Sequence, residues 1–165
     1  MDNKEAAVRI THIFDATPDL VFEAWTDPEQ LLLWYAPQGC KLFYKHIEVR
    51  KGGTFHSCIQ DPLYGDCWCK GTYLEIDPPY KLVYTVALCD AEGNSVQSAQ
   101  VGKDGAWPSS TTVTVFFTPV GNKTQVQLHQ NVSESLAKKT GAYPSWIQML
   151  ERLNERFKET NASSL

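Results

Sequence analysis

YPSWIQMLERLNERF, residues 143–157, is the stretch that decides how this chain folds. Its large apolar residues recur at the three- and four-residue spacing of one helix face. They are Trp146, Met149, Leu150, Leu153 and Phe157. Covering all five side chains would contribute on the order of 7–15 kcal/mol before the entropy of ordering them is subtracted. The segment therefore predicts a long amphipathic helix that lies on an apolar surface.

Charged residues of both signs occupy the other face of this helix. They are Glu151, Arg152, Glu155, Arg156, Lys158 and Glu159. Water solvates such a mixed set, and the three-residue spacing from Arg152 to Glu155 suits an ion pair along the helix. We therefore expect this face to lie at the surface and to take no part in a site.

The chain between residues 40 and 131 predicts an antiparallel sheet for the helix to cover. Apolar and polar residues alternate in segments that are bounded by glycine, proline and aspartate. We expect strands over residues 41–49, 54–59, 67–76, 81–88, 112–118 and 123–131. Five residues of the last two strands should point at the helix: Val113, Val115, Phe117, Val126 and Leu128.

The N-terminal part predicts one more strand and two short helices. Residues 8–14 alternate as a strand does. Thr17-Pro18 supplies a cap residue and a proline at the first helical position. Asp27 and Gln30 form a reciprocal capping pair for a second helix that runs through Trp34. The fold class is therefore α+β, with a curved antiparallel sheet of six to seven strands wrapped around a long C-terminal helix.

Length, composition and charge bound the other properties of the chain. Its 165 residues, 42% of them hydrophobic, suit a single domain over residues 1–165 with its core at about 8–158. A net charge of −4 without a basic cluster argues against nucleic acid and anionic membranes as partners. No secretory signal or run of 18 apolar residues occurs, so we expect a cytoplasmic protein. Its five cysteines should be free thiols.

Three groups of motifs stand out along the chain: VFEAWTDPEQL (21–31) with Trp34, EVRKGGTF (48–55), and GTYLEIDPP (71–79) with LVYT (82–85). Together they resemble one branch of the START-like, or SRPBCC, superfamily. They are similar to the family named for the activator of the heat-shock protein 90 ATPase. The resemblance covers about residues 8–158 and implies the helix-grip fold. Because these motifs are caps and turns, they are specific for the fold and weak for function.

Two segments depart from the family pattern. Residues 141–146, Gly-Ala-Tyr-Pro-Ser-Trp, replace a bare Gly-Trp before the last helix. Residues 90–110 form a longer connection than we expect of the family, and we interpret them as a mobile loop. The eukaryotic activator also has a separate chaperone-binding domain, for which 165 residues leave no room. We therefore do not expect co-chaperone activity of that kind.

A metal site is one reading of His56-x-Cys58 and Cys67-x-Cys69. If the turn between the two strands centres on Pro62-Leu63, Cys58 lies opposite Cys67 and His56 opposite Cys69, close enough for zinc. A slip of one residue removes this arrangement. Ordinary strand packing explains the same residues more simply, so we predict no metal or other cofactor.

No signature of catalysis is present. His12, His46 and His129 lie on predicted strands and suit hydrogen-bonded sheet positions better than a catalytic role. The carboxylates Glu48 and Glu75 lie near strand ends or turns, where solvated roles dominate. We therefore predict no catalytic residue.

Aromatic residues make the best case for a site. The resemblance implies a cavity between sheet and C-terminal helix, and a largely apolar cavity suits a small hydrophobic or aromatic molecule. The candidate ligand contacts are Trp34, Phe55, Trp68, Tyr84, Phe117, Trp146, Met149, Leu150 and Leu153. Tyr73 is the alternative to Trp68, because the two lie on opposite faces of one strand. Plain core packing is the competing reading for each of these residues.

The sequence therefore favours the binding of a small ligand as the function. We expect the protein to be a monomer or a homodimer. A chaperone-associated protein-interaction module is the first alternative, since the family name suggests it. A small-molecule cyclase or hydrolase that uses the same cavity is the second.

Overall fold

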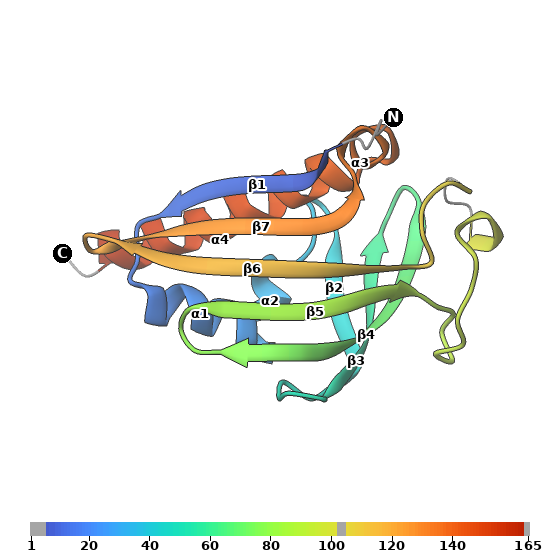
Figure 1. Cartoon of the computed structure of the whole chain (residues 1–165), viewed down its shortest axis with the longest axis horizontal. Coiled ribbons are helices and arrows are strands. Elements are labelled where there is room, and N and C mark those ends of the chain that lie inside the picture. Colours follow the sequence, from blue (N-terminus) through green and yellow to red (C-terminus); the bar gives the residue numbers. More distant parts are fainter. Residues whose placement is uncertain (1–5, 102–104, 164–165) are drawn as a thin grey trace.

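The computed structural model describes residues 6–101 and 105–163, and within them seven strands and four α-helices form the fold (Figure 1). The strands are β1 (Ala7–Phe14), β2 (Lys41–Ile47), β3 (Thr54–Asp61), β4 (Gly65–Asp77), β5 (Lys81–Leu88), β6 (Ser110–Val120) and β7 (Lys123–Ser133). The helices are α1 (Pro18–Thr26), α2 (Pro28–Trp34), α3 (Glu134–Thr140) and α4 (Ala142–Ser163), with a 3-10 turn, η1, at Ser98–Val101. The predicted α+β helix-grip architecture is confirmed.

The sheet is antiparallel throughout, in the order β1-β7-β6-β5-β4-β3-β2. The first two strands of the chain therefore lie at opposite edges, and α1 and α2 connect them. Contacts of α1 with β6 and β7, and of α2 with β2 and α4, place the two short helices across the same face as α4. The edge strand β2 pairs with β3 through a bulge between Tyr44 and His46.

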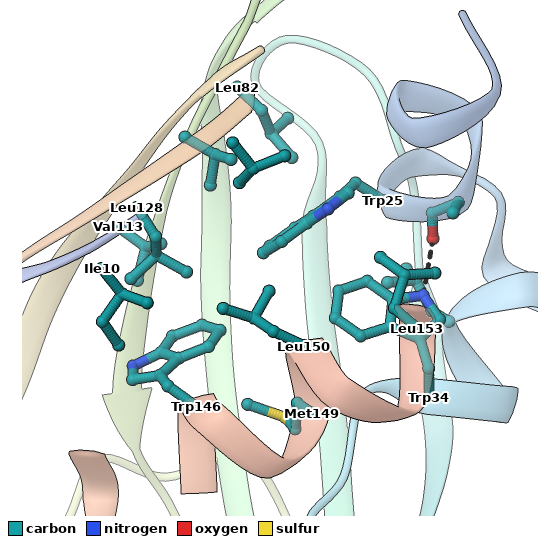
Figure 2. Packing of buried hydrophobic residues seen from close by; sticks show 14 of the residues in the cluster. Ile10, Trp25, Trp34, Leu82, Val113, Leu128, Trp146, Met149, Leu150 and Leu153 are labelled. Carbon is teal, nitrogen blue, oxygen red and sulfur yellow. Dashed lines mark hydrogen bonds between the residues drawn. The ribbon is translucent and has the colours of Figure 1, made fainter. Parts of the chain in front are cut away.

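The apolar stripe of α4 is buried against this face, as predicted. Trp146, Met149, Leu150 and Leu153 are at most 5% exposed, and Figure 2 shows Trp146 beside Ile10 of the sheet and Leu153 beside Trp34 of α2. Phe157 is half-buried and meets Phe14 edge-on, with ring centroids 5.9 Å apart. The five strand residues predicted to face the helix are all buried, which confirms the register of the β6–β7 hairpin.

A buried polar link joins α4 to the sheet. The indole Nε1 of Trp146 donates to Oε1 of Gln130 on β7 at 2.9 Å, and Nε2 of Gln130 donates to Oγ1 of Thr111 on β6 at 3.0 Å. Both sheet residues are buried, so each of these polar groups needs a partner inside the protein. The link fixes the position of the first turns of α4 relative to two central strands.

The short helices begin at their prolines, but their caps differ from expectation. Thr17 precedes α1 without a capping hydrogen bond from its side chain. Asp27 does cap α2, accepting from the backbone N–H of Glu29 at 3.0 Å, while Nε2 of Gln30 donates to its carboxylate at 3.3 Å. The pair therefore meets through side chains instead of bonding reciprocally to the backbone. No helix in the described part of the chain is long and apolar enough to span a membrane.

The first part of the 90–110 connection is tethered to the sheet. Cys89 pairs with Ser95, and Asp90 accepts hydrogen bonds from the backbone N–H groups of Glu92 and Asn94. These contacts hold the start of the segment that was interpreted as a mobile loop, and η1 follows them. Residues 102–104 lie outside the described residues.

Three basic side chains hold that tethered part. Each comes from a different neighbouring strand: Lys45 of β2 donates to the carbonyl of Ala91 at 2.5 Å, and Lys70 of β4 to that of Gly93 at 2.8 Å. His56 of β3 bonds through Nε2 to the carbonyl of Asp90 at 3.1 Å. The backbone of residues 90–93 thus covers the outer face of these three strands.

We expect Leu150→Ala to lower the free energy of unfolding by about 2–5 kcal/mol, because it leaves a cavity in the centre of the core. Urea unfolding measures the change. Leu63→Ala is the matched control, since Leu63 is 82% exposed at the tip of the β3–β4 hairpin and should change stability little. Equal effects of the two substitutions would contradict this account of the core.

Candidate functional site

A small cavity lies between strands β2–β5 and helices α1 and α2. Eight residues line it: Trp25, Leu31, Tyr35, Tyr44, Phe55, Ser57, Tyr73 and Tyr84. We call it the tyrosine cavity, because four of the eight are tyrosines. Its volume of about 20 Å³ is roughly the space that one water molecule needs. The site therefore lies under the two short helices and not under α4.

The strand register explains why these side chains meet. Tyr44 of β2 lies opposite Ser57 of β3, and Tyr73 of β4 lies opposite Tyr84 of β5. Side chains directly opposite one another in an antiparallel pair share a face of the sheet. Tyr35 comes from outside the sheet, at the residue that follows α2.

A glycine makes room for one wall of the cavity. Gly71 lies opposite Phe55, and a Cβ at this position would be 2.5 Å from Cε2 of the Phe55 ring. It would also lie 1.8 Å from the carbonyl oxygen of Thr85 on β5. The ring of Phe55 can therefore lie flat over β4 only because residue 71 has no side chain.

The tyrosine hydroxyls are held in their neutral form. Those of Tyr35 and Tyr84 are 2.7 Å apart and share a hydrogen bond. Burial raises the pKa of both groups, and it raises the pKa of Tyr44 as well. Burial also raises the pKa of Tyr73 to about 12. At neutral pH the cavity thus presents phenol groups, each of which carries a proton to donate.

One residue that lines the cavity has a buried polar group without a partner. The side chain of Trp25 is 1% exposed, and its Nε1 is the buried side-chain nitrogen or oxygen without a hydrogen bond among the described residues. The neighbouring Trp34, by contrast, donates from Nε1 to the carbonyl of Ala24 at 2.9 Å (Figure 2). An unpaired buried donor is unfavourable and rare, and therefore requires an explanation.

The cavity lining restricts the chemistry of the site. The eight residues include no carboxylate, imidazole, amine, guanidinium or thiol. General acid–base catalysis near neutral pH needs a group that exchanges protons there, and covalent catalysis needs an activated nucleophile. The lining offers apolar surface and hydroxyl and indole donors, which are the elements of a binding site.

Arg152 of α4 holds the segment that closes the cavity. Its Nη1 donates to the carbonyl of Ala36 at 2.5 Å, and its Nη2 to that of Leu33 at 3.2 Å. Four residues earlier on α4, Oε1 of Gln148 accepts from the backbone N–H of Gln38 at 3.0 Å. The expectation of a purely solvated face is therefore wrong at Arg152, which binds the end of α2 across the helix interface.

The sequence model of the family described as Activator of Hsp90 ATPase homolog 1-like protein matches residues 15–158. The chain belongs to this family. The match includes all the residues that line the tyrosine cavity and the Arg152 contact. No curated protein matches the chain.

Solved structures from several organisms share the fold. A protein from Arthrobacter aurescens has a TM-score of 0.81 at 21% identity, over 96% of this chain and 90% of that chain. One from Staphylococcus epidermidis has a TM-score of 0.75 at 24% identity, over 96% and 93% of the two chains. Protein Ms6760 from Mycobacterium smegmatis has a TM-score of 0.78 at 16% identity, over 96% and 95%. At these identities the similarity establishes the fold alone.

In this family member only two of the predicted ligand contacts, Phe55 and Tyr84, line the tyrosine cavity. Six others are buried in the hydrophobic core: Trp34, Phe117, Trp146, Met149, Leu150 and Leu153. The α4 residues among them pack against the sheet, because the cavity is displaced toward β2–β5. Tyr73 was predicted as the alternative to Trp68, and in the structure it lines the cavity.

Trp68 lies on the opposite, outer face of the sheet, so its predicted place in the cavity is wrong. It pairs with Cys58, contacts the rings of Phe43 and His56, and lies under the ammonium group of Lys45 at 5.0 Å. Trp68 and Tyr73 are separated by five positions on a strand, and one of the two had to face outward.

The strand pairing on which a zinc site would depend is also wrong by one residue. Cys58 pairs with Trp68, and Cys69 pairs with Ser57, because the turn of the β3–β4 hairpin contains three residues between Asp61 and Gly65. Cys67 and Cys69 therefore face the other side of the sheet from Cys58. The described residues contain no group of three His, Cys, Asp or Glu side chains placed to hold a metal ion.

The other lining residues were not predicted from the sequence, for different reasons. They are Trp25, Leu31, Tyr35, Tyr44 and Ser57. Ser57 lies two positions after Phe55 on β3 and opposite Tyr44 of β2, so the alternation along β3 is a usable signal for Ser57. Tyr35 follows a helix, where no periodicity predicts direction. His12, His46 and His129 all lie outside the lining, as expected of sheet residues.

Arg152→Met should lower the free energy of unfolding by about 1–3 kcal/mol, since it removes charge-assisted hydrogen bonds to the end of α2. Hydrogen exchange at the backbone amide of Gln38 should also become faster, because the segment that Arg152 holds is released. Arg156→Met is the matched control on an exposed position of the same helix. If both variants exchange alike, Arg152 does not hold this segment.

Stability should fall as the pH rises from about 10 to 12. A raised pKa means that the folded protein keeps a proton that the unfolded chain loses above its ordinary pKa of 10.0. For Tyr73 the stabilisation is complete below pH 10.0 and disappears toward pH 12. Tyr73→Phe should therefore reduce the slope of unfolding free energy against pH by up to about 1.4 kcal/mol per unit. Urea unfolding at several pH values measures both slopes, and equal slopes would contradict the burial of this hydroxyl.

Proposed function

We propose that this chain binds a small, largely apolar molecule in the tyrosine cavity. The observation that carries the proposal is a buried lining in which apolar walls surround several hydroxyl groups. Small-molecule sites combine these two elements, with apolar surface for affinity and a few polar groups for orientation. A plain core has no need of the second element.

Entry of a ligand requires the cavity to open. The present volume of about 20 Å³ is far below that of an aromatic ring, since a cavity of roughly 150 Å³ is needed for benzene. We assign the opening to the segment after α2, which would have to break its hydrogen bonds with the side chains of Arg152 and Gln148 on α4. Binding then selects or induces an open form in which Tyr35 separates from Tyr84.

The two alternatives from sequence receive less support. A cyclase or hydrolase needs an acid, base or nucleophile, and the residues that line the cavity supply none at neutral pH. A chaperone-associated module needs a continuous apolar patch. The exposed large apolar residues of the described chain are spread over strands, helices and turns, from Ile13 on β1 to Leu63 at a hairpin tip.

Thermal-shift measurements with neutral one- and two-ring aromatic compounds test the proposal. At a concentration 100 times its dissociation constant, a ligand stabilises the folded state by about 2.7 kcal/mol, which corresponds to roughly 5–10 °C. Native mass spectrometry should show one molecule bound to each chain.

Ser57→Leu should abolish this shift, because the larger side chain fills the cavity. Ser110→Leu is the matched control at an exposed strand position. It should bind as the unmodified protein does. A panel that shifts nothing, or a shift that survives Ser57→Leu, would refute binding in the tyrosine cavity.

A further inference from the structure

A second hollow, separate from the tyrosine cavity, lies between α1 and the turn that connects β4 to β5 (Figure 1). Its lining residues are Asp19, Phe22, Glu23, Thr26, Pro78 and Pro79. We call this hollow the α1 groove. Its volume of about 420 Å³ falls within the range of roughly 300–1,000 Å³ that is typical of ligand sites. The groove and the tyrosine cavity have no lining residue in common, so the two can bind different partners.

The two walls of the α1 groove are fixed to the same residue of β6. The ring of Phe22 on α1 meets that of Phe117 edge-on, with ring centroids 5.0 Å apart. The backbone N–H of Phe117 also donates to the carbonyl of Tyr80 at 2.8 Å, directly after the two prolines of the turn. Because both walls are anchored in this way, the groove exists before a ligand arrives, and binding needs little reorganisation.

The polar side chains that line the groove are all hydrogen-bond acceptors. Asp19 and Glu23 are exposed, and their carboxylates make no ion pair or hydrogen bond with another described residue. The hydroxyl of Thr26 donates to the carbonyl of Phe22 at 2.9 Å, so its oxygen is left with acceptor capacity only. The two prolines have no backbone N–H to offer. A ligand that is complementary to this lining therefore donates hydrogen bonds.

The negative charge of the groove is not balanced from within the described chain. Elsewhere on the surface, Glu75 has the ammonium group of Lys81 at 3.2 Å, and other carboxylates have similar partners. No lysine or arginine is among the lining residues of the groove. The net charge of −4 on the whole chain adds a longer-range attraction for cations. The groove is thus complementary in charge to a basic ligand.

The spacing of the two carboxylates suits alternate side chains of an extended peptide. Asp19 and Glu23 are one turn apart on α1, which puts their Cβ atoms about 5–6 Å apart. In an extended chain each residue advances about 3.3 Å, so side chains two positions apart lie on the same side at about 6.6 Å. Two basic residues with one residue between them can therefore reach both carboxylates.

The apolar part of the lining favours long basic side chains. The aliphatic stems of lysine and arginine pack on apolar surface such as Phe22 and the two prolines, while their charged ends stay beside acceptors. Arginine fits better than lysine, because its planar guanidinium group can donate two parallel hydrogen bonds to one carboxylate. A metal ion fits less well, since the described residues contain no group of three His, Cys, Asp or Glu side chains placed to hold one.

We infer that the α1 groove binds an extended segment of a partner protein with the pattern Arg-x-Arg. One guanidinium group pairs with Asp19 and the other with Glu23, and the stems of both arginines lie on the apolar walls. This interaction goes beyond the binding of a small apolar molecule and does not depend on it.

Three fluorescein-labelled peptides test the inference by fluorescence anisotropy. The first is Ala-Arg-Ala-Arg-Ala, the second has citrulline in place of both arginines, and the third is Ala-Ala-Arg-Arg-Ala. Citrulline keeps the size of arginine without its charge, and adjacent arginines point to opposite sides of an extended chain. We expect the first peptide to bind at least about fivefold more tightly than either of the others, as two partly exposed ion pairs provide. The preference over the citrulline peptide should shrink as salt rises from about 0.05 to 0.3 M.

Substitutions on α1 locate the binding. Asp19→Asn and Glu23→Gln should each weaken binding of the Arg-x-Arg peptide about two- to fivefold and leave binding of the citrulline peptide unchanged. Glu151→Gln removes the same charge at an exposed position of α4 outside the groove, and should keep the full preference. In NMR spectra, the backbone amide signals of α1 and of residues 77–80 should shift with the Arg-x-Arg peptide.

Each contrary outcome overturns a stated part of the inference. Equal binding of the Arg-x-Arg and citrulline peptides would show that charge does not select the ligand. A preference that survives both α1 substitutions would place the binding outside the groove. Equal affinity for the peptide with adjacent arginines, or for arginine amide alone, would replace the extended segment by a ligand that needs only one carboxylate.

Discussion

The burial of α4 against one half of the sheet is the interaction on which the other features depend. Trp146 and Leu150 fill the space over β1, β6 and β7, and a buried glutamine ties the helix to two of these strands. The half formed by β2–β5 faces α2, the segment after it and Trp25 at the end of α1. The tyrosine cavity lies between these residues and the four strands.

Local patterns predicted most of the fold. Each of these patterns is formed by residues that are close in the sequence: the apolar stripe of α4, the prolines that begin α1 and α2, and the alternation in β6 and β7. The position of the site depends on contacts between residues that are far apart in the sequence. The three-residue turn after Asp61 shifts the β3–β4 register by one from the predicted pairing, and this shift puts Cys67 and Cys69 on the other face from Cys58. The contact of Arg152 with Ala36 joins residues 116 positions apart, and no periodicity signals it.

The candidate site was therefore predicted in kind but displaced in position. An aromatic cavity between sheet and helices was expected, yet the expected contacts from α4 belong to the core. The chemistry of the lining follows from burial, which raises the pKa of the tyrosines so that they stay protonated well above neutral pH, and which leaves the indole N–H of Trp25 without a partner. Both properties emerge only when the residues are assembled, because the sequence contains no measure of local solvation.

An open sheet leaves two edges, and the edge formed by β2 is the one nearer the cavity. Unpaired backbone groups on an edge strand can recruit another chain and start aggregation. The bulge between Tyr44 and His46 interrupts the regular spacing that an added strand would need. Lys45 also places a positive charge there, and its bond to Ala91 brings a covering loop over the neighbouring face. The irregularity that positions a cavity tyrosine thus also protects the molecule from edge-to-edge association.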